Sequence, residues 1–539
     1  MKKIKVGAVA LSSLMAVSCF AGCNKEKAAN DENTLQIYCI EAGYGVDWLY
    51  KAADAFKVAY PEYSVVIETE EGVNRVENML TSGPKNTTHD LLFTTEKLAK
   101  LQASGPNALA GYDCVMENLT DMYNTKVPGE NVTLKEKTAD YLLDLYAVEE
   151  ENAEGEWEDN YYMFSWANSL MGIVYNKTMF AEKTVSVPRT TEEFYDVCDV
   201  LKQDVAPIIG SFAVSYTGAV ATTWWAQYEG QAEYMRYWEP TSLNDYDTIS
   251  QKGKLYQVQI QNQIYKPSYN RLHEDTIDSN YTESQAKFIT REAAMLFCGD
   301  WFENEMKSLI EQNKKQGIND EYGMMKTPLN SAVVEKLSFW DSTKDYSTVF
   351  QAARGDNPDE TQLQILKEAD AKLTQIIDYV DGETTEKPDF STDEDIAIVR
   401  ESRNIAITYG PGHQAVIPTY ATAKEAAKKF LLFLASDKAQ KIFTEATSGA
   451  TMPYGYDPIA DNVQLSVFAT SAIKVTNEAV VVPHSSVTKG EWLIGLSGLR
   501  LPSSRMATEN DYLTPEYIYQ DSIIDYSEYQ RLLETASII

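Results

Sequence analysis

The sequence predicts an α/β fold divided into two large domains. Short apolar runs that suit buried strands alternate with segments whose apolar residues recur at helical spacing, and the second half is the richer in helix. At 539 residues the chain is too long for one hydrophobic core. Its apolar (44%) and charged (24%) fractions are those of a soluble globular protein.

The first elements form a predicted βαβ unit. Residues 35–40 have the character of a strand, residues 46–60 that of an amphipathic helix, and residues 64–69 that of a second strand. Because such units are nearly always right-handed, we expect these two strands to be parallel neighbours in one sheet. Residues 90–93 form a further buried strand.

A strand followed by a tryptophan is predicted within residues 291–306. Residues 293–298 are an apolar run without alternation, which suits a strand buried on both faces of a parallel sheet. Gly299 lets the chain turn, and Asp300 stands where a helix N-cap belongs, with Glu303 three residues later as in a capping box. Trp301 is therefore expected at the carboxyl end of a strand, where open α/β sheets bind their ligands.

Two more helix starts carry the capping-box spacing. Thr190 with Glu193 precedes one helix, and Thr422 with Glu425 precedes another. The run Asn-Pro-Asp-Glu at residues 357–360 predicts a third start, with an N-cap, a proline and acids in the first turn.

The remaining segments are assigned by their periodicity and polarity. The helix that starts near residue 357 keeps its apolar period as far as residue 382, and another helix covers residues 436–447. Residues 149–160 are acidic and predict a solvated surface loop, and residues 383–395 are polar and also predict a loop.

The N-terminus predicts export and lipid anchoring. Residues 1–5 are basic and residues 6–20 are an apolar run too short for a permanent membrane span. They end in Phe-Ala-Gly-Cys at residues 20–23, which resembles the lipobox of bacterial lipoproteins. The resemblance implies a signal peptide at residues 1–22, acylation (palmitate) on Cys23, and a location on the outer face of the cytoplasmic membrane. Residues 23–33 would be a polar tether.

The net charge limits the kinds of binding partner. A formal charge of −33 excludes a polyanion such as nucleic acid as the expected partner, whereas a cationic ligand would fit it.

The cysteines show no disulfide pattern. None of the cysteines after the lipobox forms a Cys-x-x-Cys pair, so their pairing stays open and buried free thiols are favoured. They are Cys39, Cys114, Cys198 and Cys298.

Catalytic and metal-binding motifs are missing from the sequence. It contains no Gly-x-Ser-x-Gly elbow, no His-Glu-x-x-His, no phosphate-binding loop and no Gly-x-Gly-x-x-Gly after a strand. The four histidines are not spaced as paired metal ligands. We therefore predict a protein that is not an enzyme and needs neither a metal nor a cofactor.

Aromatic residues near strand ends indicate sugar binding. A sugar ring presents C–H groups on its faces and hydroxyls at its rim, so an aromatic plate beside a carboxylate or amide can hold it. The aromatic candidates are Trp166 beside Asn168, the pair Trp224 and Trp225, and Trp301. The neighbouring acceptors are Glu41, Glu96 and Asp300. A packing role remains the alternative for each tryptophan, and for the adjacent pair we expect one to face inward and the other outward.

Several segments in order resemble the extracellular solute-binding proteins of bacterial sugar ABC importers, the family that includes maltose-binding protein. They are the lipobox with the strand and helix of residues 35–61, Gly-Ile-Val-Tyr-Asn-Lys at residues 172–177, Pro-Arg-Thr at residues 188–190, residues 293–302, residues 322–328, residues 415–418 and residues 426–440. The insert at residues 342–403 and the tail after residue 461 fit the family pattern less clearly.

The resemblance implies two lobes joined by a hinge, each lobe a mostly parallel sheet flanked by helices. The N-terminal lobe would contain residues 34–165 and 404–455, and the C-terminal lobe residues 166–403 and 456–539. The chain would cross between them near residues 165–168, 404–409 and 452–456. A monomer with a carbohydrate bound between its lobes would dock on membrane permease subunits.

The family's contact positions map onto Glu41, Tyr44, Thr95, Glu96, Trp166, Asn168, Asp300 and Trp301. Trp224, Trp225 and His413 are added from the residues themselves. Two other functions stay open, namely a surface glycoside hydrolase that uses a carboxylate pair and a binding protein for a cationic solute such as a polyamine. The particular sugar, its length and the permease are left undetermined.

Overall fold

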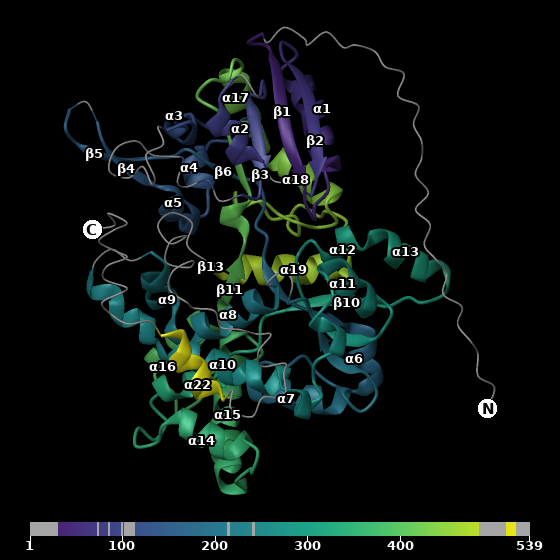
Figure 1. Cartoon of the computed structure of the whole chain (residues 1–539), viewed down its shortest axis with the longest axis vertical. Helices are drawn as coiled ribbons and strands as arrows, with labels where there is room; N and C mark the ends of the chain where they lie inside the picture. The colour runs from purple at the N-terminus through teal and green to yellow at the C-terminus, as the bar shows by residue number, and fades with distance from the viewer. Residues whose placement is uncertain are drawn as a thin grey trace.

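The fold was described from a computed structural model that covers residues 31–72, 75–84, 87–96, 98, 101, 114–152, 154–212, 216–239, 243–484 and 514–523. Two sheets, each flanked by helices, form two lobes, one in the upper part and one in the lower part of Figure 1. The predicted α/β class is confirmed. The predicted signal peptide, Cys23 and the first part of the tether fall outside the described residues.

The sheet of the first lobe contains five strands in the order β2-β1-β3-β12-β6. Its strands β1, β2 and β3 are parallel, as the βαβ prediction requires, while β12 runs antiparallel to β3 and to β6. The strands are β1 (Thr34–Glu41), β2 (Ser64–Glu71), β3 (Leu91–Thr94), β6 (Phe164–Ser165) and β12 (Gln414–Val416).

Helices cover this sheet and complete the first lobe. The predicted amphipathic helix is α1, whose buried face includes Trp48, Leu49 and Phe56. The helices are α1 (Asp47–Ala59), α2 (Val76–Ser82), α3 (Thr120–Tyr123), α4 (Leu134–Lys137), α5 (Asp140–Tyr146), α17 (Lys424–Leu434) and α18 (Asp437–Ala446).

The sheet of the second lobe contains four strands in the order β10-β7-β9-β8. Every residue of β9 is buried, as predicted for this strand. Only β8 and β9 are parallel, because β7 enters the lobe in the opposite direction and lies between β9 and β10. This sheet is therefore mixed rather than mostly parallel. Its strands are β7 (Met171–Asn176), β8 (Ala206–Ile209), β9 (Ala293–Gly299) and β10 (Tyr322–Met325).

The second lobe carries most of the helices. The chief ones are α6 (Lys177–Lys183), α7 (Thr191–Leu201), α8 (Tyr216–Glu229), α9 (Gln231–Trp238), α10 (Lys252–Tyr265), α11 (Tyr281–Ile289), α12 (Phe302–Glu305), α13 (Lys307–Lys315), α14 (Tyr346–Arg354), α15 (Glu360–Val380), α16 (Asp393–Asn404), α19 (Val467–Glu478) and α22 (Pro515–Ser522). Strands β11 (Ile405–Thr408) and β13 (Val480–Pro483) form a small parallel sheet beside them (Figure 1).

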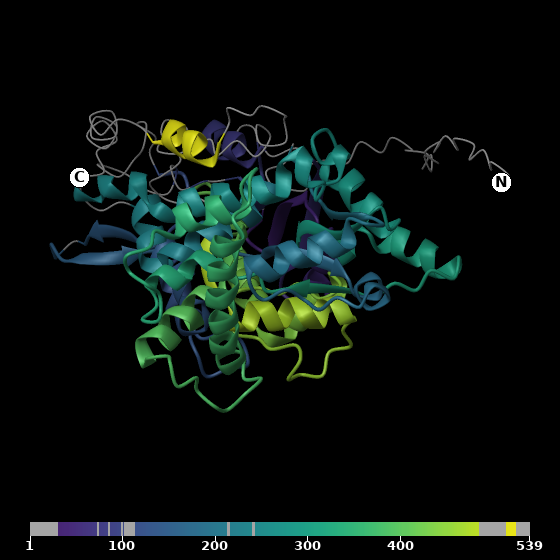
Figure 2. The same ribbon diagram turned by 90° about the horizontal axis from the view of Figure 1, so that it is seen from below.

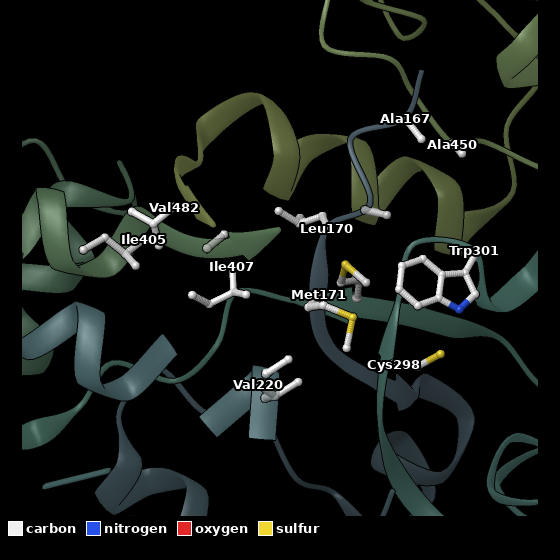
Figure 3. Close-up of a cluster of buried hydrophobic side chains, with 14 of the residues drawn as sticks. Ala167, Leu170, Met171, Val220, Cys298, Trp301, Ile405, Ile407, Ala450 and Val482 are labelled. Carbon is white, nitrogen blue, oxygen red and sulfur yellow. The ribbon is translucent and has the colours of Figure 1, made fainter. Parts of the chain in front are cut away.

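Three connections between the lobes lie side by side. They are residues 166–170 between β6 and β7, residues 409–413 between β11 and β12, and residues 447–466 between α18 and α19. Hydrogen bonds join them, from the backbone N–H of Trp166 to the carbonyl of His413, from Tyr409 to Ser169, and from Asn168 to Thr451. The apolar core continues through this region, where Leu170 and Met171 pack near Ile407 and Trp301 (Figure 3).

The segment predicted as an acidic surface loop is a β-hairpin. Strands β4 (Val148–Glu151) and β5 (Trp157–Asn160) pair antiparallel and project from the first lobe in both views (Figures 1 and 2). The loop predicted at residues 383–395 ends three residues early, at Thr392, because Thr392 and Asp395 form a capping box that starts α16 at Asp393.

Of the three helix starts at α7, α15 and α17, two differ from the predicted ones. Thr190 caps α7 as predicted, accepting a bond from the N–H of Glu193. In contrast, α15 starts two residues later than expected, with Asp359 as its N-cap. No side chain caps α17, because Asp90 takes the N–H groups of Thr422 and Ala423.

Among the described residues, all four cysteines after the lipobox are free, and three of them are buried. The favoured state, buried free thiols, is thus confirmed for Cys39, Cys198 and Cys298, while Cys114 is partly exposed. No helix within the described ranges has the length and apolar character needed to span a membrane.

Candidate functional site

Tyr44 lies at the junction of the lobes and bonds to both of its polar neighbours there. Its hydroxyl donates to Oδ1 of Asp300 over 2.6 Å, and Oγ of Ser169 lies 3.0 Å from the same hydroxyl. Tyr44 belongs to the loop between β1 and α1, Asp300 follows β9, and Ser169 belongs to the connection between β6 and β7. The contact therefore joins the first lobe, the second lobe and the hinge.

Aromatic rings surround the Tyr44 phenol. The rings of Trp166, Trp301 and His413 all meet it edge to face, with centroids 5.8, 6.0 and 5.8 Å away. Trp166 and Trp301 are 1% and 5% exposed. We call Tyr44, Trp166, Ser169, Asp300, Trp301 and His413 the junction cluster. Five of its six members were singled out from the sequence as candidate ligand contacts.

Counting donors gives the direction of the hydrogen bonds in the cluster. Because the one hydroxyl proton of Tyr44 goes to Asp300, the Ser169 hydroxyl donates to Tyr44. Nδ1 of His413 then donates to Ser169 over 3.0 Å and also faces the carbonyl of Tyr409. This chain of bonds needs a proton on Nδ1 of His413. Burial lowers the pKa of that imidazole to about 4, which favours the neutral tautomer that carries this proton.

The Asp300 carboxyl is buried and strongly perturbed. Removal from water raises its pKa to about 7, although the bonds from Tyr44 and from the N–H of Leu170 favour the charged form. Because its carboxyl makes these bonds, Asp300 does not cap the following helix as predicted. Helix α12 begins at Phe302 without a side-chain cap, and Glu303 accepts a bond from Ser466 instead of forming a capping box.

Trp301 stands where the sequence predicted it, directly after β9. The ring of Tyr216 meets its indole edge to face at 5.6 Å, and the indole lies beside Cys298 with its nitrogen turned away from Met171 (Figure 3). That nitrogen is buried and has no hydrogen-bond partner among the described residues. A buried N–H donor left unpaired costs free energy, so a ligand acceptor would be favoured here.

Glu305 and Gln285 lie near Trp301 and were not predicted. Gln285 donates to Oε2 of Glu305 over 2.6 Å, while burial raises the pKa of the Glu305 carboxyl to about 7. A Cβ atom built on Gly43 would lie 2.8 Å from both Glu305 and Trp301. Glu305 lies four residues after Trp301, and its first-turn position in a helix was the only sequence signal for it.

Four predicted contacts make no side-chain hydrogen bond to the junction cluster within the described part of the chain. Glu41 is exposed at the end of β1. Glu96 accepts from the N–H of Glu77 at the start of α2, and Thr95 precedes it in the same bend. The Asn168 amide donates to the Thr451 hydroxyl over 2.8 Å within the hinge.

Trp224 and Trp225 pack inside the second lobe. They are 0% and 2% exposed on α8, and their indole N–H groups donate to the carbonyl of Pro328 and to the side chain of Gln251. The expectation that one of them faces outward is wrong. Helix α8 is buried on nearly all sides, so no outward face was available to the pair.

A pocket of about 290 Å³ opens between the lobes, beside the junction cluster. Helices α12 and α13 form one wall and α18 forms the other, with Lys307, Lys314 and Glu445 among the lining residues. Phe443 of α18 contacts Tyr44, and its neighbour Thr444 lines the pocket.

Comparison with known proteins shows which family this sequence matches. Residues 42–372 match the sequence model of a family described as bacterial extracellular solute-binding protein. A comparison with curated proteins gives no match.

Several solved structures share the two-lobed fold. One is a putative binding protein, msme, from Bacillus subtilis subsp. subtilis str. 168 in an open conformation (16% identity, TM-score 0.52, 94% of this chain and 99% of that chain). Another is SBP RafE in complex with raffinose (12%, 0.52, 93% and 99%). A third is the GacH receptor of Streptomyces glaucescens GLA.O, unliganded and in complex with acarbose (13%, 0.54, 93% and 98%). At these identities the similarity establishes the fold.

Proposed function

The chain belongs to the bacterial extracellular solute-binding protein family, and we propose that it captures a neutral sugar or oligosaccharide between its lobes for delivery to an ABC importer. The observation that carries this proposal is that the Trp301 ring and the Asp300 carboxyl both contact one side chain, Tyr44, where the two lobes meet. A ring plate and an acceptor side by side suit a sugar's face and rim.

The ligands of similar structures support a sugar as the solute. One of those structures holds raffinose and another holds acarbose, and both are neighbours of this chain in fold. The family and these neighbours are binding proteins, which favours capture over catalysis.

We propose the junction cluster as the ligand site, with Trp301 and Asp300 as its main contacts to the sugar. Glu41, Thr95, Glu96 and Asn168 would line its edges, whereas the packing of Trp224 and Trp225 favours a structural role for that pair. The lobes would be residues 34–165 with 404–455, and residues 166–403 with 456–539. Closure around the solute would create the surface that docks on the permease subunits.

Lipid attachment at Cys23 is part of the proposal, with the protein a monomer held on the outer face of the membrane. Cys19, within the predicted signal peptide, is the rival position for the lipid and provides the control. Labelled palmitate should be incorporated into wild type and Cys19→Ala but not into Cys23→Ala. Labelling of Cys23→Ala would contradict lipid attachment at Cys23.

A thermal-shift screen tests the function. Raffinose, acarbose and chitin oligosaccharides should be compared with spermidine, and each mixture examined for cleavage products. A ligand at a hundredfold excess over its Kd should raise the melting temperature by roughly 3–5 °C. A shift with spermidine alone would favour a cationic solute, and cleavage of an oligosaccharide would favour a hydrolase.

A further inference from the structure

The loop before α1 binds the second lobe directly. Asn304 of α12 donates to the carbonyl of Gly43 over 2.8 Å, and Tyr44 donates to Asp300 over 2.6 Å. A Cβ on Gly43 would approach the Trp301 indole and Glu305 to 2.8 Å, so the loop lies against both side chains. The two lobes are therefore tied together by side chains of this chain itself.

Tyr44 presents to these partners the same chemistry that a sugar would present. Its apolar ring meets that of Trp301 edge to face, and it gives its hydroxyl proton to Asp300. A second donor, the Ser169 hydroxyl, satisfies its oxygen. Tyr44 is 2% exposed, so no solvent separates it from these groups.

The Tyr44 hydroxyl also bonds to a residue of the hinge, Ser169. Ser169 is fully buried and has a backbone φ of 50°, a left-handed conformation that residues other than glycine adopt rarely. Its hydroxyl lies between Tyr44 and His413, and its carbonyl accepts from the N–H of Tyr409. Loss of the Tyr44 bond would therefore remove one of the bonds that hold this hinge residue, as well as the contact between the lobes.

We propose that Tyr44 is a built-in competitor that occupies the solute position on Trp301 and Asp300 and must withdraw before a solute binds. This inference rests on the proposed function. It sets the solute class as a neutral polyhydroxy compound whose hydroxyl takes the place of the Tyr44 phenol on Asp300. The affinity for the sugar is then the intrinsic affinity reduced by the fraction of molecules in which Tyr44 is docked.

Removing the hydroxyl while keeping the ring tests the proposal. In Tyr44→Phe the bonds to Asp300 and Ser169 are lost, so the Kd for the best sugar of the screen should fall by roughly five- to tenfold. The radius of gyration without sugar, measured by small-angle X-ray scattering, should rise. Asn304→Ala, which removes the second tie, should act in the same direction.

Tyr50→Phe is the matched control, since Tyr50 is 45% exposed on α1 and should change neither quantity. A higher Kd for Tyr44→Phe would make the hydroxyl a direct sugar contact and would overturn the proposal, as would an unchanged Kd. If no sugar binds either protein, the proposed function fails; an increased radius of gyration in Tyr44→Phe would then still support the tie between the lobes, and an unchanged one would overturn it.

Discussion

The position of the Trp301 ring depends on the absence of a side chain at Gly299, two residues before it. A Cβ on Gly299 would lie 2.2–2.5 Å from three atoms of the Trp301 ring. Gly299 has no positive φ, so the close approach of the indole, and not a special backbone turn, requires glycine here. The residue that was expected only to let the chain turn therefore sets the position of the candidate ligand contact.

Gly299→Ala should displace the indole. Because the ring cannot share its place with a methyl group, we expect a loss of about 1–3 kcal/mol of unfolding free energy and a sugar affinity at least tenfold weaker. Chemical denaturation and calorimetric titration measure the two effects. Gly218→Ala in α8 is the control, since no atom lies within 4 Å of its Cβ position. Unchanged affinity in Gly299→Ala would show that the indole position does not matter for binding.

Single residues were predictable where chain position alone decided their role. Trp301 followed β9 as expected, because strand and tryptophan are adjacent in the sequence. Ser169 was missed because its role depends on Tyr44, 125 residues away, and on His413, 244 residues away. The prediction that Asp300 caps a helix was wrong for the same reason, since its carboxyl accepts a hydrogen bond from Tyr44 of the other lobe.

Helix α15 is hydrogen-bonded to the rest of the second lobe through a buried carboxyl, that of Asp370. Asp370 accepts bonds of 3.0 Å from Thr190 and from Ser331 and is 8% exposed. Burial, followed by the nearby charge of Glu192, raises the Asp370 pKa to about 7. The insert at residues 342–403 is thus part of the second lobe's core.

The raised pKa of Asp370 gives stability a dependence on pH. The folded protein keeps the proton that the unfolded chain loses near pH 4, so this contribution is full at low pH and is lost as pH rises through about 7. Between pH 5 and 8, wild type should lose about 2 kcal/mol of unfolding free energy more than Asp370→Asn does.

Urea unfolding of both proteins at pH 5, 6, 7 and 8 measures this difference, and the effect of His413 cancels between them. The control is Asp393→Asn, because Lys387 lowers the Asp393 pKa and no proton is gained or lost there above pH 5. Its curve should run parallel to that of wild type. Parallel curves for Asp370→Asn as well would mean that Asp370 is already ionised in the folded protein.

Elements with a buried face or a continuous apolar run were predictable from the sequence. Exposed strands, and helix starts that depend on residues distant in the sequence, were not. The strands β1, β2 and β9 and the helix α1 all appear within one or two residues of their expected bounds. The β4–β5 hairpin was missed because it is largely exposed, so no alternation of apolar residues marks its strands. The start of α17 was misjudged because the chain just before it, at Thr422 and Ala423, donates to Asp90, which is distant in the sequence, and no side chain caps the helix.

The whole molecule has two lobes that the chain connects three times. Its class followed from the order of strands and helices, but the mixed sheet of the second lobe did not, because the direction of β7 depends on where the chain leaves the first lobe. The junction cluster combines residues from both lobes and the hinge. Such a site forms only in the folded molecule, which is why the sequence indicated its members singly.

The central claim, that a sugar is held at Trp301 between the lobes, is tested most directly by calorimetric titration of the best sugar into Trp301→Leu and Trp157→Ala. Trp157 is 68% exposed on the hairpin and provides the control. A cooperative thermal transition verifies that each variant is folded. We predict binding at least thirtyfold weaker in Trp301→Leu and unchanged binding in Trp157→Ala. Wild-type affinity in a folded Trp301→Leu protein would contradict the account.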